Sequence, residues 1–504
     1  MKNRVKIIGK HGKGKLSNLK VLLFALNGSY THTSLALRCL RAPLERAGFE
    51  VQLLERNLRD RTAHVLRDLV ASDAEIVSFS AYIWNIRPML ELARDLKALR
   101  PECHIVFGGP EVSFDTERFD GEEYRFIDAI VRGEGEETLP ALCRAWESGQ
   151  DVPRIWEKSV SSEIMRDEGI LYREHDFPSG SMLYYESSRG CPFSCAYCLS
   201  SATCGVRSKS VEQTLADLAE FERLPEHIRI IKFVDRTFNF SISRANRIWE
   251  ALLSERFTRH YHFEVCASLL NEESFAVLKQ FPKGKIQLEF GLQSTYEPTL
   301  QAVSRHIRPQ KVLENVRRIH EMGNIHVHLD LIAGLPYEDY SRFAQSFDEA
   351  YPCCDLLQLG FLKLLHGTEL RDRAEEYGYR YMHEAPYTVL QTKWMTYEEM
   401  SELTAVAEIL ERYRESGKFD HCLNIVLDGS CSPFRFYEGL CDYIAAYDGR
   451  HIQKISQVDA YRLLYEYVSH LLSGEKLERF SDAMHRDFTA GEVRKVPAFL
   501  HGTL

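Results

Sequence analysis

The sequence lacks several features that would assign the chain to a large class of proteins. No apolar run approaches the ~20 residues of a membrane-spanning helix, so we expect no membrane segment. Residues 1–20 are basic but have no apolar core like that of a secretory signal, and we expect residues 1–18 to be a flexible leader. Positive charge is in deficit, because the net charge is −10, which argues against a large nucleic-acid surface.

The chain has 13 cysteines but no signal of export, so we expect reduced thiols in the cytoplasm rather than a disulfide framework. Its 504 residues exceed one ordinary core and predict two or three domains. The hydrophobic fraction of 44% and the charged fraction of 27% are those of a soluble globular protein.

Residues 19–150 alternate strand-like and helix-like segments, which predicts a doubly wound α/β domain. Residues 19–26 form a continuous apolar run, as expected of a strand buried in a parallel sheet. Ligands of such sheets bind where loops leave the carboxyl ends of the strands. Four predicted loops lie there, at residues 27–32, 78–85, 108–111 and 132–136.

The rest of the chain divides into three parts. Residues 151–181 show no sustained period and read as a linker. Residues 182–370 alternate six predicted strands with helices, which indicates a partial barrel with its chemistry at the carboxyl strand ends. Residues 371–504 have apolar residues at helical spacing, and we expect a mainly helical domain there.

Three cysteines, Cys191, Cys195 and Cys198, follow the first predicted strand of this second alternation. Three thiolates in one loop can hold three irons of a four-iron, four-sulfur cluster and leave the fourth iron open. A structural zinc site is the alternative interpretation; it would need a fourth ligand, and Cys204 is near enough to be considered.

The spacing of the cysteines, with Tyr197 just before the last of them, resembles the radical S-adenosylmethionine (SAM) superfamily. By this resemblance the open iron chelates SAM, and one electron from the reduced cluster cleaves SAM to a 5′-deoxyadenosyl radical. Later predicted strand ends carry further family-like segments, Phe233–Asn239, Glu289–Ser294, Leu331–Pro336 and Leu362–Thr368. The resemblance implies SAM contacts from Tyr197, Asp235, Glu289, Gln293, Ser294 and Leu335; an N-cap role is the alternative for Asp235.

The order of the four N-terminal loops resembles the cobalamin-binding domain that precedes the barrel in the cobalamin-dependent branch of this superfamily. The resemblance implies a Rossmann-like cobalamin-binding domain with contacts from Tyr30, Thr31, Ser80, Trp84, Gly108, Gly109, Glu111, Gly133, Glu134 and Gly135. The Asp-x-His-x-x-Gly motif, whose histidine ligates cobalt in many such domains, is missing here. Trp84 or a neighbour in its loop is the candidate to cover the lower face of cobalt, and core packing is the alternative role for Trp84.

Together these resemblances predict a cobalamin-dependent radical SAM enzyme that uses a 4Fe-4S cluster, SAM and cobalamin. The family implies a methyltransferase acting at an unactivated carbon of a small-molecule or peptide substrate, with an electron donor such as flavodoxin or ferredoxin. Radical rearrangement or cyclisation without methyl transfer remains open. Two further alternatives are a tRNA methylthiotransferase-like enzyme, which would need a second cluster, and a non-enzymatic cobalamin and iron–sulfur sensor.

Overall fold

A computed structural model gives the fold of residues 19–158, 169–173, 176, 182–202, 205–448 and 454–490. The predicted leader, part of the predicted linker, Cys204 and the last residues of the chain lie outside these ranges. The described chain divides into two compact units, one ending at Tyr185 but including Arg207–Ile231, and one containing Glu186–Val206 and all residues from Lys232 onward.

The first sheet is entirely parallel and has the strand order β2-β1-β3-β4-β5-β6. Its strands are β1 (Lys20–Asn27), β2 (Glu50–Asn57), β3 (Ile76–Ser80), β4 (His104–Gly108), β5 (Ala129–Arg132) and β6 (Ile155–Glu157). The order reverses between β1 and β3, so the loops after these strands diverge at a switch point, where α/β sheets bind ligands. Strand β6 lies inside the predicted linker; its three residues are too short a run to produce a recognisable period.

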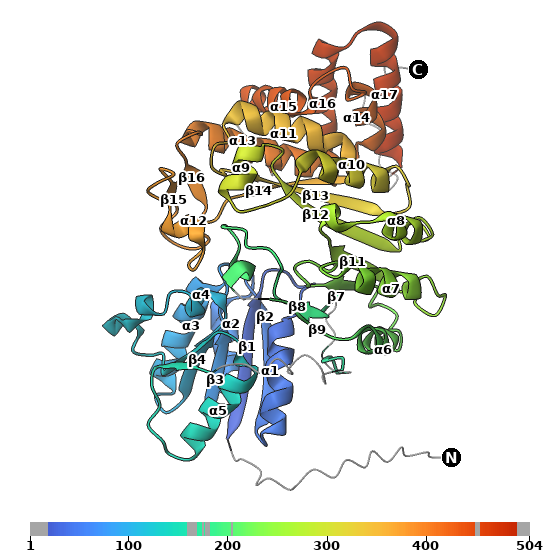
Figure 1. Cartoon of the computed structure of the whole chain (residues 1–504). Coiled ribbons are helices and arrows are strands. Elements are labelled where there is room, and N and C mark those ends of the chain that lie inside the picture. Colours follow the sequence, from blue (N-terminus) through green and yellow to red (C-terminus); the bar gives the residue numbers. More distant parts are fainter. Residues whose placement is uncertain are drawn as a thin grey trace. The chain divides into compact units, whose positions relative to one another are not determined.

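Helices follow the strands of this sheet, as the alternation predicts (Figure 1). They are α1 (Leu35–Arg46), α2 (Thr62–Ala71), α3 (Ile86–Leu99), the short turns α4 (Pro110–Ser113), η1 (Glu117–Asp120) and η2 (Glu122–Tyr124), and α5 (Gly135–Glu147). Leu37 and Leu44 of α1 share one core with Leu139 and Leu142 of α5 and with Val21 of β1. Burying this apolar surface fixes the sheet that presents the loops.

The second sheet has the order β14-β13-β12-β11-β10-β7, and β11 to β14 run parallel. Six strands and an open edge at β14 give the predicted partial barrel. Its strands are β7 (Met182–Tyr185), β10 (Ile230–Phe233), β11 (His260–Glu264), β12 (Ile286–Gln293), β13 (His326–Ala333) and β14 (Leu356–Phe361). The intervening elements are β8 (Ser188–Arg189), η3 (Leu199–Ala202), β9 (Arg207–Ser208), α6 (Val211–Phe221), α7 (Ile242–Leu252), η4 (Ala267–Leu269), α8 (Glu272–Leu278), α9 (Glu297–Ala302), α10 (Pro309–His320), α11 (Tyr340–Ala350) and η5 (Tyr351–Cys353).

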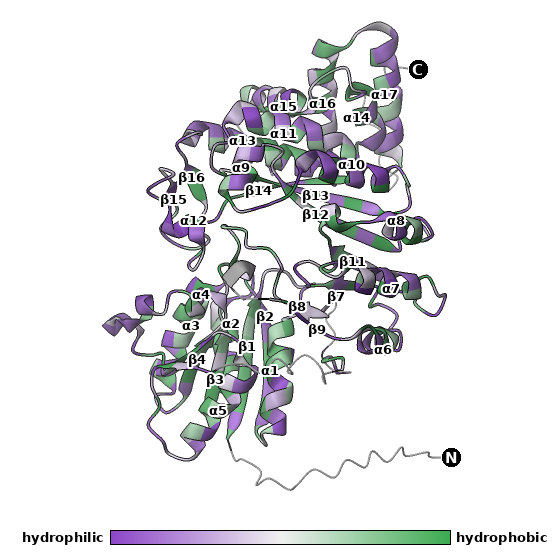
Figure 2. Cartoon of the chain, viewed as in Figure 1, coloured by the Kyte–Doolittle hydropathy of each residue, from purple (hydrophilic) through white to green (hydrophobic). Residues whose placement is uncertain are grey.

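The two faces of the second sheet differ in polarity. Along β12, buried Leu288, Phe290 and Leu292 alternate with Glu289 and Gln293, because successive side chains of a strand point to opposite faces. Figure 2 shows the same mixture of hydrophobic and hydrophilic residues along β12 and β13, whereas β1 is almost uniformly hydrophobic. The polar face of the barrel sheet therefore carries the side chains that can do chemistry.

The C-terminal region is mainly helical, as predicted. Its elements are α12 (Glu369–Asp372), the hairpin strands β15 (Arg380–Tyr381) and β16 (Val389–Gln391), α13 (Tyr397–Leu410), a π-helical turn η6 (Glu411–Glu415), α14 (Asp420–Val426), α15 (Pro433–Asp448), α16 (Gln457–Leu471) and α17 (Gly474–Thr489). In the described ranges, none of these or the other helices combines the length and the apolar character needed to cross a membrane.

Candidate active site

The four predicted N-terminal loops follow β1, β3, β4 and β5, which are neighbours in one parallel sheet, so the loops emerge at the same edge. Ser80 is the last residue of β3 and is buried. Tyr30 is 57% exposed after β1, and its hydroxyl donates to Asp60 Oδ1 at 2.8 Å. Thr31 is exposed beside Ser29, at 3.0 Å between their hydroxyl oxygens. The fold brings these side chains to the switch point.

Asn85 fixes the loop that follows β3. It is buried, its Nδ2 donates to the carbonyls of Leu26 and Ser80 at 3.1 Å, and its Oδ1 accepts from Tyr82 N at 2.8 Å. Trp84 is 51% exposed, and its ring stacks on that of Tyr82 with centroids 4.4 Å apart. The loop therefore presents a flat aromatic surface to solvent, which disagrees with the core-packing alternative for Trp84.

The glycine loops after β4 and β5 are joined by Ser113. Its hydroxyl donates to Gly109 O at 2.8 Å and accepts from Gly133 N at 3.1 Å. Gly109 has a φ of +107°, and a Cβ there would lie 2.4 Å from Ala81 O, so no other residue fits without a shift. Gly133 also has a positive φ, of +76°, but open space surrounds its Cβ position.

The remaining predicted residues of this edge have defined places. Gly108 ends β4, and its carbonyl accepts from Ala81 N at 2.7 Å. Glu111 is buried in α4, with Oε1 3.7 Å from Arg118 Nη1. Glu134 is the N-cap of α5 and forms an ion pair with Arg207, and Gly135 begins that helix against Leu40. A polar, glycine-lined edge at a helix N-terminus suits a ligand with a phosphate-bearing tail.

The three cysteines lie in the second unit, in the loop after β7. Cys195 is buried, and Cys191 and Cys198 are partly buried. Ala196 holds the middle of the loop, because its N–H donates to Val303 O at 2.9 Å and its carbonyl accepts from Leu370 N at 3.0 Å. The loop is thus tied to segments more than 100 residues away before any cofactor binds.

The Cys191 sulfur lies 3.5 Å from Thr237 Oγ1. Burial raises the pKa of Cys191, and the contact with Thr237 opposes that shift. A buried thiol needs a cation to become a thiolate, which iron supplies. The donor set therefore fits an iron–sulfur cluster.

Asp235 anchors the base of the cysteine loop. It is fully buried, and its carboxylate accepts hydrogen bonds from Ser187 N at 2.7 Å and from the hydroxyls of Ser187 and Ser188 at 2.5 and 2.7 Å. Burial raises its pKa, and these serine hydrogen bonds and Arg244 counteract the shift. Its position explains why a polar residue follows β10; its predicted contact with SAM stays a prediction.

Gln293 is the most strained of the predicted SAM-contacting residues. Its φ is +73°, which non-glycine residues rarely adopt, and the pairing of β12 with β13 shifts register between Gly291 and Gln293. Its buried Oε1 has no hydrogen-bond partner within the described structure. Strain and an unpartnered polar atom are typical of a ligand-binding position.

Two other predicted residues lie deeper. Ser294 is fully buried, and its hydroxyl donates to Glu338 Oε1 at 2.7 Å; Leu335 is fully buried in the loop after β13. Burial raises the pKa of Glu338 to about 7. These buried side chains pack beneath the loops at the strand ends. A direct contact with SAM stays a prediction for them.

Glu289 stands at the centre of a chain of charged groups on the polar face of the barrel sheet. Its Oε2 accepts from His262 Nε2 at 2.8 Å and lies 3.3 Å from Lys232 Nζ and 3.7 Å from His328 Nδ1. Burial would raise the pKa of Glu289, but His262 and Lys232 outweigh it and hold the value at about 2. Glu289 is therefore ionised at neutral pH.

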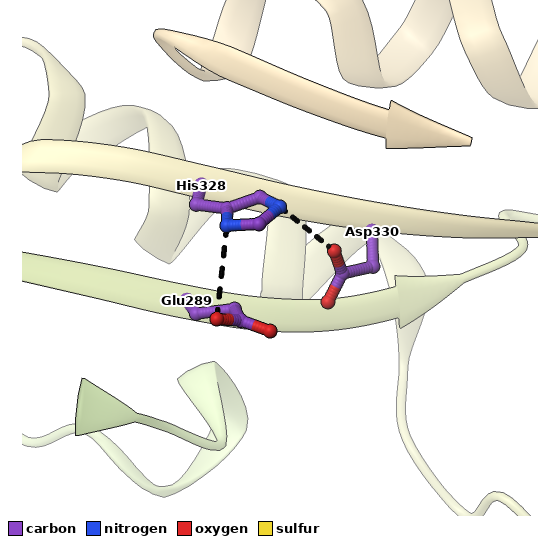
Figure 3. A group of neighbouring side chains, drawn as sticks. All are labelled: Glu289, His328 and Asp330. Atoms are coloured by element: carbon purple, nitrogen blue, oxygen red, sulfur yellow. Dashed lines mark ion pairs between the residues drawn. The ribbon is translucent and has the colours of Figure 1, made fainter. Parts of the chain in front are cut away.

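His328 lies between two carboxylates, as Figure 3 shows. Nδ1 faces Glu289, and Nε2 lies 3.0 Å from Asp330 Oδ1 at an angle too poor for a hydrogen bond. Burial would lower the pKa of His328, but Asp330 and Glu289 raise it above its usual value. Burial raises the pKa of Asp330 and brings that of Glu264, at the end of β11, to about 7.

Among the described residues, one group of three side chains has ligand atoms close enough to hold a metal ion. It consists of Glu289, His328 and Asp330, whose ligand atoms lie within 4.8 Å of one another. In this structure the two nitrogens of His328 are paired with different carboxylates (Figure 3). Lys232 adds a positive charge that opposes a cation. An imidazole that lies between two acids and has a raised pKa is therefore a better interpretation than a metal ligand.

Several residues of the site were missed by the sequence reasoning. They are Asn85, Ser113, Thr237, His262, Asp330, Arg305 and Glu338. The alternation of His326, His328 and Asp330 along one strand was the available signal for a polar barrel face. Nothing in the sequence pairs Thr237 with Cys191, since 46 residues separate them.

Three family models match successive parts of the chain. The B12 binding domain model matches residues 22–143, the radical SAM superfamily model residues 185–350, and a model described as a protein of unknown function (DUF4080) residues 375–503. The first two matches cover the loop edge and the three-cysteine loop, and they confirm the predicted cofactor classes.

Two curated relatives are similar to this chain over more than half of its length. An uncharacterized methyltransferase of Pyrococcus horikoshii is 26% identical over 341 residues, which are 62% of this chain and 72% of the relative. The cobalamin-dependent radical SAM methyltransferase TokK of Streptomyces tokunonensis is 25% identical over 430 residues. That match covers 74% of this chain but only 61% of TokK.

Among solved structures, the cobalamin-dependent SAM radical enzyme OxsB with aqua-cobalamin and SAM superposes with a TM-score of 0.64. The match covers 94% of this chain and 84% of OxsB at 13% identity, and it shows a shared fold. With the loop edge, the three-cysteine loop and both family models in one polypeptide, the chain combines a B12 binding domain with a radical SAM domain and is homologous to cobalamin-dependent radical SAM methyltransferases.

Proposed function

We propose that this chain is a cobalamin-dependent radical SAM methyltransferase that acts at an unactivated carbon of a small-molecule or peptide substrate. The observation that carries the proposal is the presence, in one chain, of a three-cysteine loop at a barrel strand end and a B12 binding domain. Relatives named as methyltransferases support methyl transfer.

The residues present fit the implied cofactors. Cys191, Cys195 and Cys198 would hold the cluster, with Thr237 beside Cys191. Gln293 offers an unpartnered buried oxygen for SAM, and the open space at the Cβ position of Gly133, on the same loop edge as Gly109, suits the cobalamin tail. When bound, the cluster supplies the electron that cleaves SAM, and cobalamin supplies a carrier for the methyl group.

The protein itself orients the cysteine loop and holds charged side chains on the barrel face. Asp235 with Ser187 and Ser188 fixes the start of the cysteine loop. Glu289 is ionised, and Asp330 and Glu289 raise the pKa of His328, so charged groups are fixed on the barrel face. Such preorganised charges reduce the reorganisation needed when a charged substrate binds.

The described cysteines outside the loop argue against a second cluster of the methylthiotransferase kind. Cys39, Cys103 and Cys143 are buried in the first domain. Cys39 lies in α1, Cys103 directly before β4 and Cys143 in α5, so these three are not gathered in one loop as Cys191, Cys195 and Cys198 are. All described cysteines are free thiols, which suits a reducing cytoplasm and an electron donor such as flavodoxin or ferredoxin.

The test is an anaerobic assay of reconstituted, reduced protein with SAM, with and without hydroxocobalamin. Mass spectrometry quantifies 5′-deoxyadenosine and S-adenosylhomocysteine. Methyl transfer predicts both products, and the formation of S-adenosylhomocysteine should depend on cobalamin. Deoxyadenosine alone would favour rearrangement or cyclisation instead, and neither product would favour the sensor alternative.

Two cysteine variants control this assay. Cys191→Ala should abolish iron incorporation and deoxyadenosine formation. Cys431→Ala removes an exposed cysteine of the C-terminal region and should leave both unchanged. Deoxyadenosine formation that survives in Cys191→Ala would contradict the assignment of the cluster.

A further inference from the structure

Arg305 is a cation held against one of the three cluster cysteines. Its Nη1 lies 3.5 Å from Cys195 Sγ and 3.3 Å from Tyr197 Oη, and its Nη2 donates to Gly291 O. A guanidinium is charged at every accessible pH. A positive charge and a hydrogen-bond donor therefore touch a sulfur that would bind iron.

The backbone dictates this placement. Helix α9 ends at Ala302, and Ser304 has a φ of +53°, which turns the chain back toward the cysteine loop. Arg305 N donates to Leu300 O at 2.9 Å, and Val303 O accepts from Ala196 N. The turn that carries Arg305 is thus bonded directly to the loop that carries Cys195.

Gly291 leaves the space that the guanidinium occupies. A Cβ at position 291 would lie 3.3 Å from Arg305 Nη2 and 2.2 Å from Gln293 Nε2. The absence of a side chain on this residue of β12 lets Arg305 reach Gly291 O and Cys195 together. A larger residue at position 291 would force Gln293 to move and would press on the guanidinium of Arg305.

Arg305 has no carboxylate partner among the described residues, and its buried Nε has no acceptor there. A desolvated cation is costly unless negative charge lies close to it. A cluster with three thiolates carries net negative charge and becomes more negative on reduction. The cluster is therefore the anion that this cation would stabilise.

We propose that Arg305 raises the reduction potential of the cluster held by Cys191, Cys195 and Cys198. The proposal rests on the proposed function only for the presence of the cluster. An electron added to the cluster increases its attraction to the fixed guanidinium, so Arg305 stabilises the reduced state more than the oxidised state. Hydrogen bonds to cluster sulfurs and local charge are known determinants of such potentials. Arg305 is accordingly a positioning residue that favours the state able to cleave SAM.

The experiment compares wild-type protein with Arg305→Gln, Arg305→Lys and Arg317→Gln. Arg317 is the matched control, because its Nη2 lies 3.5 Å from the sulfur of Cys353, which is not in the loop. Each protein is reconstituted anaerobically, iron and sulfide are measured, and the cluster is titrated against potential without SAM, with detection of its reduced form by electron paramagnetic resonance.

Arg305→Gln should lower the ratio of reduced to oxidised cluster at a fixed potential about tenfold, which corresponds to about 59 mV for one electron. Arg305→Lys keeps the charge but not the paired donors, so its cluster should have a reduction potential between those of wild type and Arg305→Gln. The reduction potential of Arg317→Gln should match that of wild type. A potential of Arg305→Gln equal to wild type would overturn the proposal. If Arg305→Gln retains no iron, a potential of Arg305→Lys at or above wild type would do so.

These outcomes are separate from the fate of the proposed function. Wild-type protein that fails to incorporate a cluster would contradict the cluster itself. Wild-type protein with a normal cluster whose potential ignores Arg305 would contradict only the role of this residue.

Discussion

The ring of His328 lies between Asp330 and Glu289, so its protonation changes the charge of the barrel face. Lys232, His262, Glu264 and Glu415 also act on this group of residues. The pKa of His328 is raised in the folded state, so its charge stabilises the fold fully below the unfolded pKa of about 6.5. That stability is lost as the pH rises through the folded pKa.

We therefore expect His328→Gln to lower the free energy of unfolding by about 2 kcal/mol near pH 5.5. This gap between wild type and variant should narrow as the pH rises above about 6.5. Urea unfolding of cluster-free protein across this pH range measures the gap. His262→Gln is the matched control. Burial lowers the pKa of His262, so its pH dependence has the opposite sign. A gap for His328→Gln that widens with pH would contradict the protonated bridge.

A substitution at Gly109 or Gly133 would be strained by the positive φ, and at Gly109 also by a clash with the backbone. Both have positive φ, but only at Gly109 would a Cβ meet backbone, at 2.4 Å from Ala81 O. We expect Gly133→Ala to cost about 1 kcal/mol from φ alone and Gly109→Ala to cost clearly more. Gly109→Ala should also retain less hydroxocobalamin after gel filtration. Equal thermal midpoints and equal cobalamin retention in the two variants would remove the loop after β4 from the site.

At the scale of elements, the π-helical turn η6 attaches the C-terminal helices to the barrel within the second unit. Arg414 Nη2 donates to Tyr351 O at 2.9 Å and to Cys354 O at 2.5 Å, and its guanidinium stacks on the Tyr351 ring at 3.6 Å. Asp348 of α11 accepts from Phe434 N at 2.8 Å, at the start of α15. π-helical turns are rare and occur often near functional sites.

Arg414→Met should lower the free energy of unfolding by about 3 kcal/mol, because it leaves two shielded carbonyls without their donor. Arg435→Met removes an exposed arginine that pairs with Glu438 and should cost less than about 1 kcal/mol. Urea unfolding followed by circular dichroism compares the two. Similar losses in both variants would show that η6 does not anchor the helices.

At the scale of the whole molecule, the two cofactor sites are built from different parts of the chain. The cobalamin-binding candidates lie within residues 19–158, and the cysteine loop lies within Glu186–Val206. We expect Cys191→Ala to lose its iron and keep wild-type retention of hydroxocobalamin, read from visible absorbance after gel filtration. Loss of both cofactors in this variant would show that cluster and cobalamin binding are coupled.

Much of the architecture follows from local pattern. The apolar run of β1 and the alternation after it predict a parallel sheet, since only a strand buried on both faces is uniformly apolar. The short β6, the hairpin of β15 and β16 and the turn α12 were missed, because two to four residues are too few to show a period.

The sequence by itself determined the cluster chemistry, because the three cysteines lie within eight residues and their spacing is local. It also placed the four loops that follow β1, β3, β4 and β5 at one edge, since parallel strands bring their carboxyl ends together. The tertiary structure alone decided that Thr237 meets Cys191, that Arg305 meets Cys195, and that His328 bridges Glu289 and Asp330. Each of these meetings joins separate strands or loops, and only the packing of the barrel sets which side chains face one another across it.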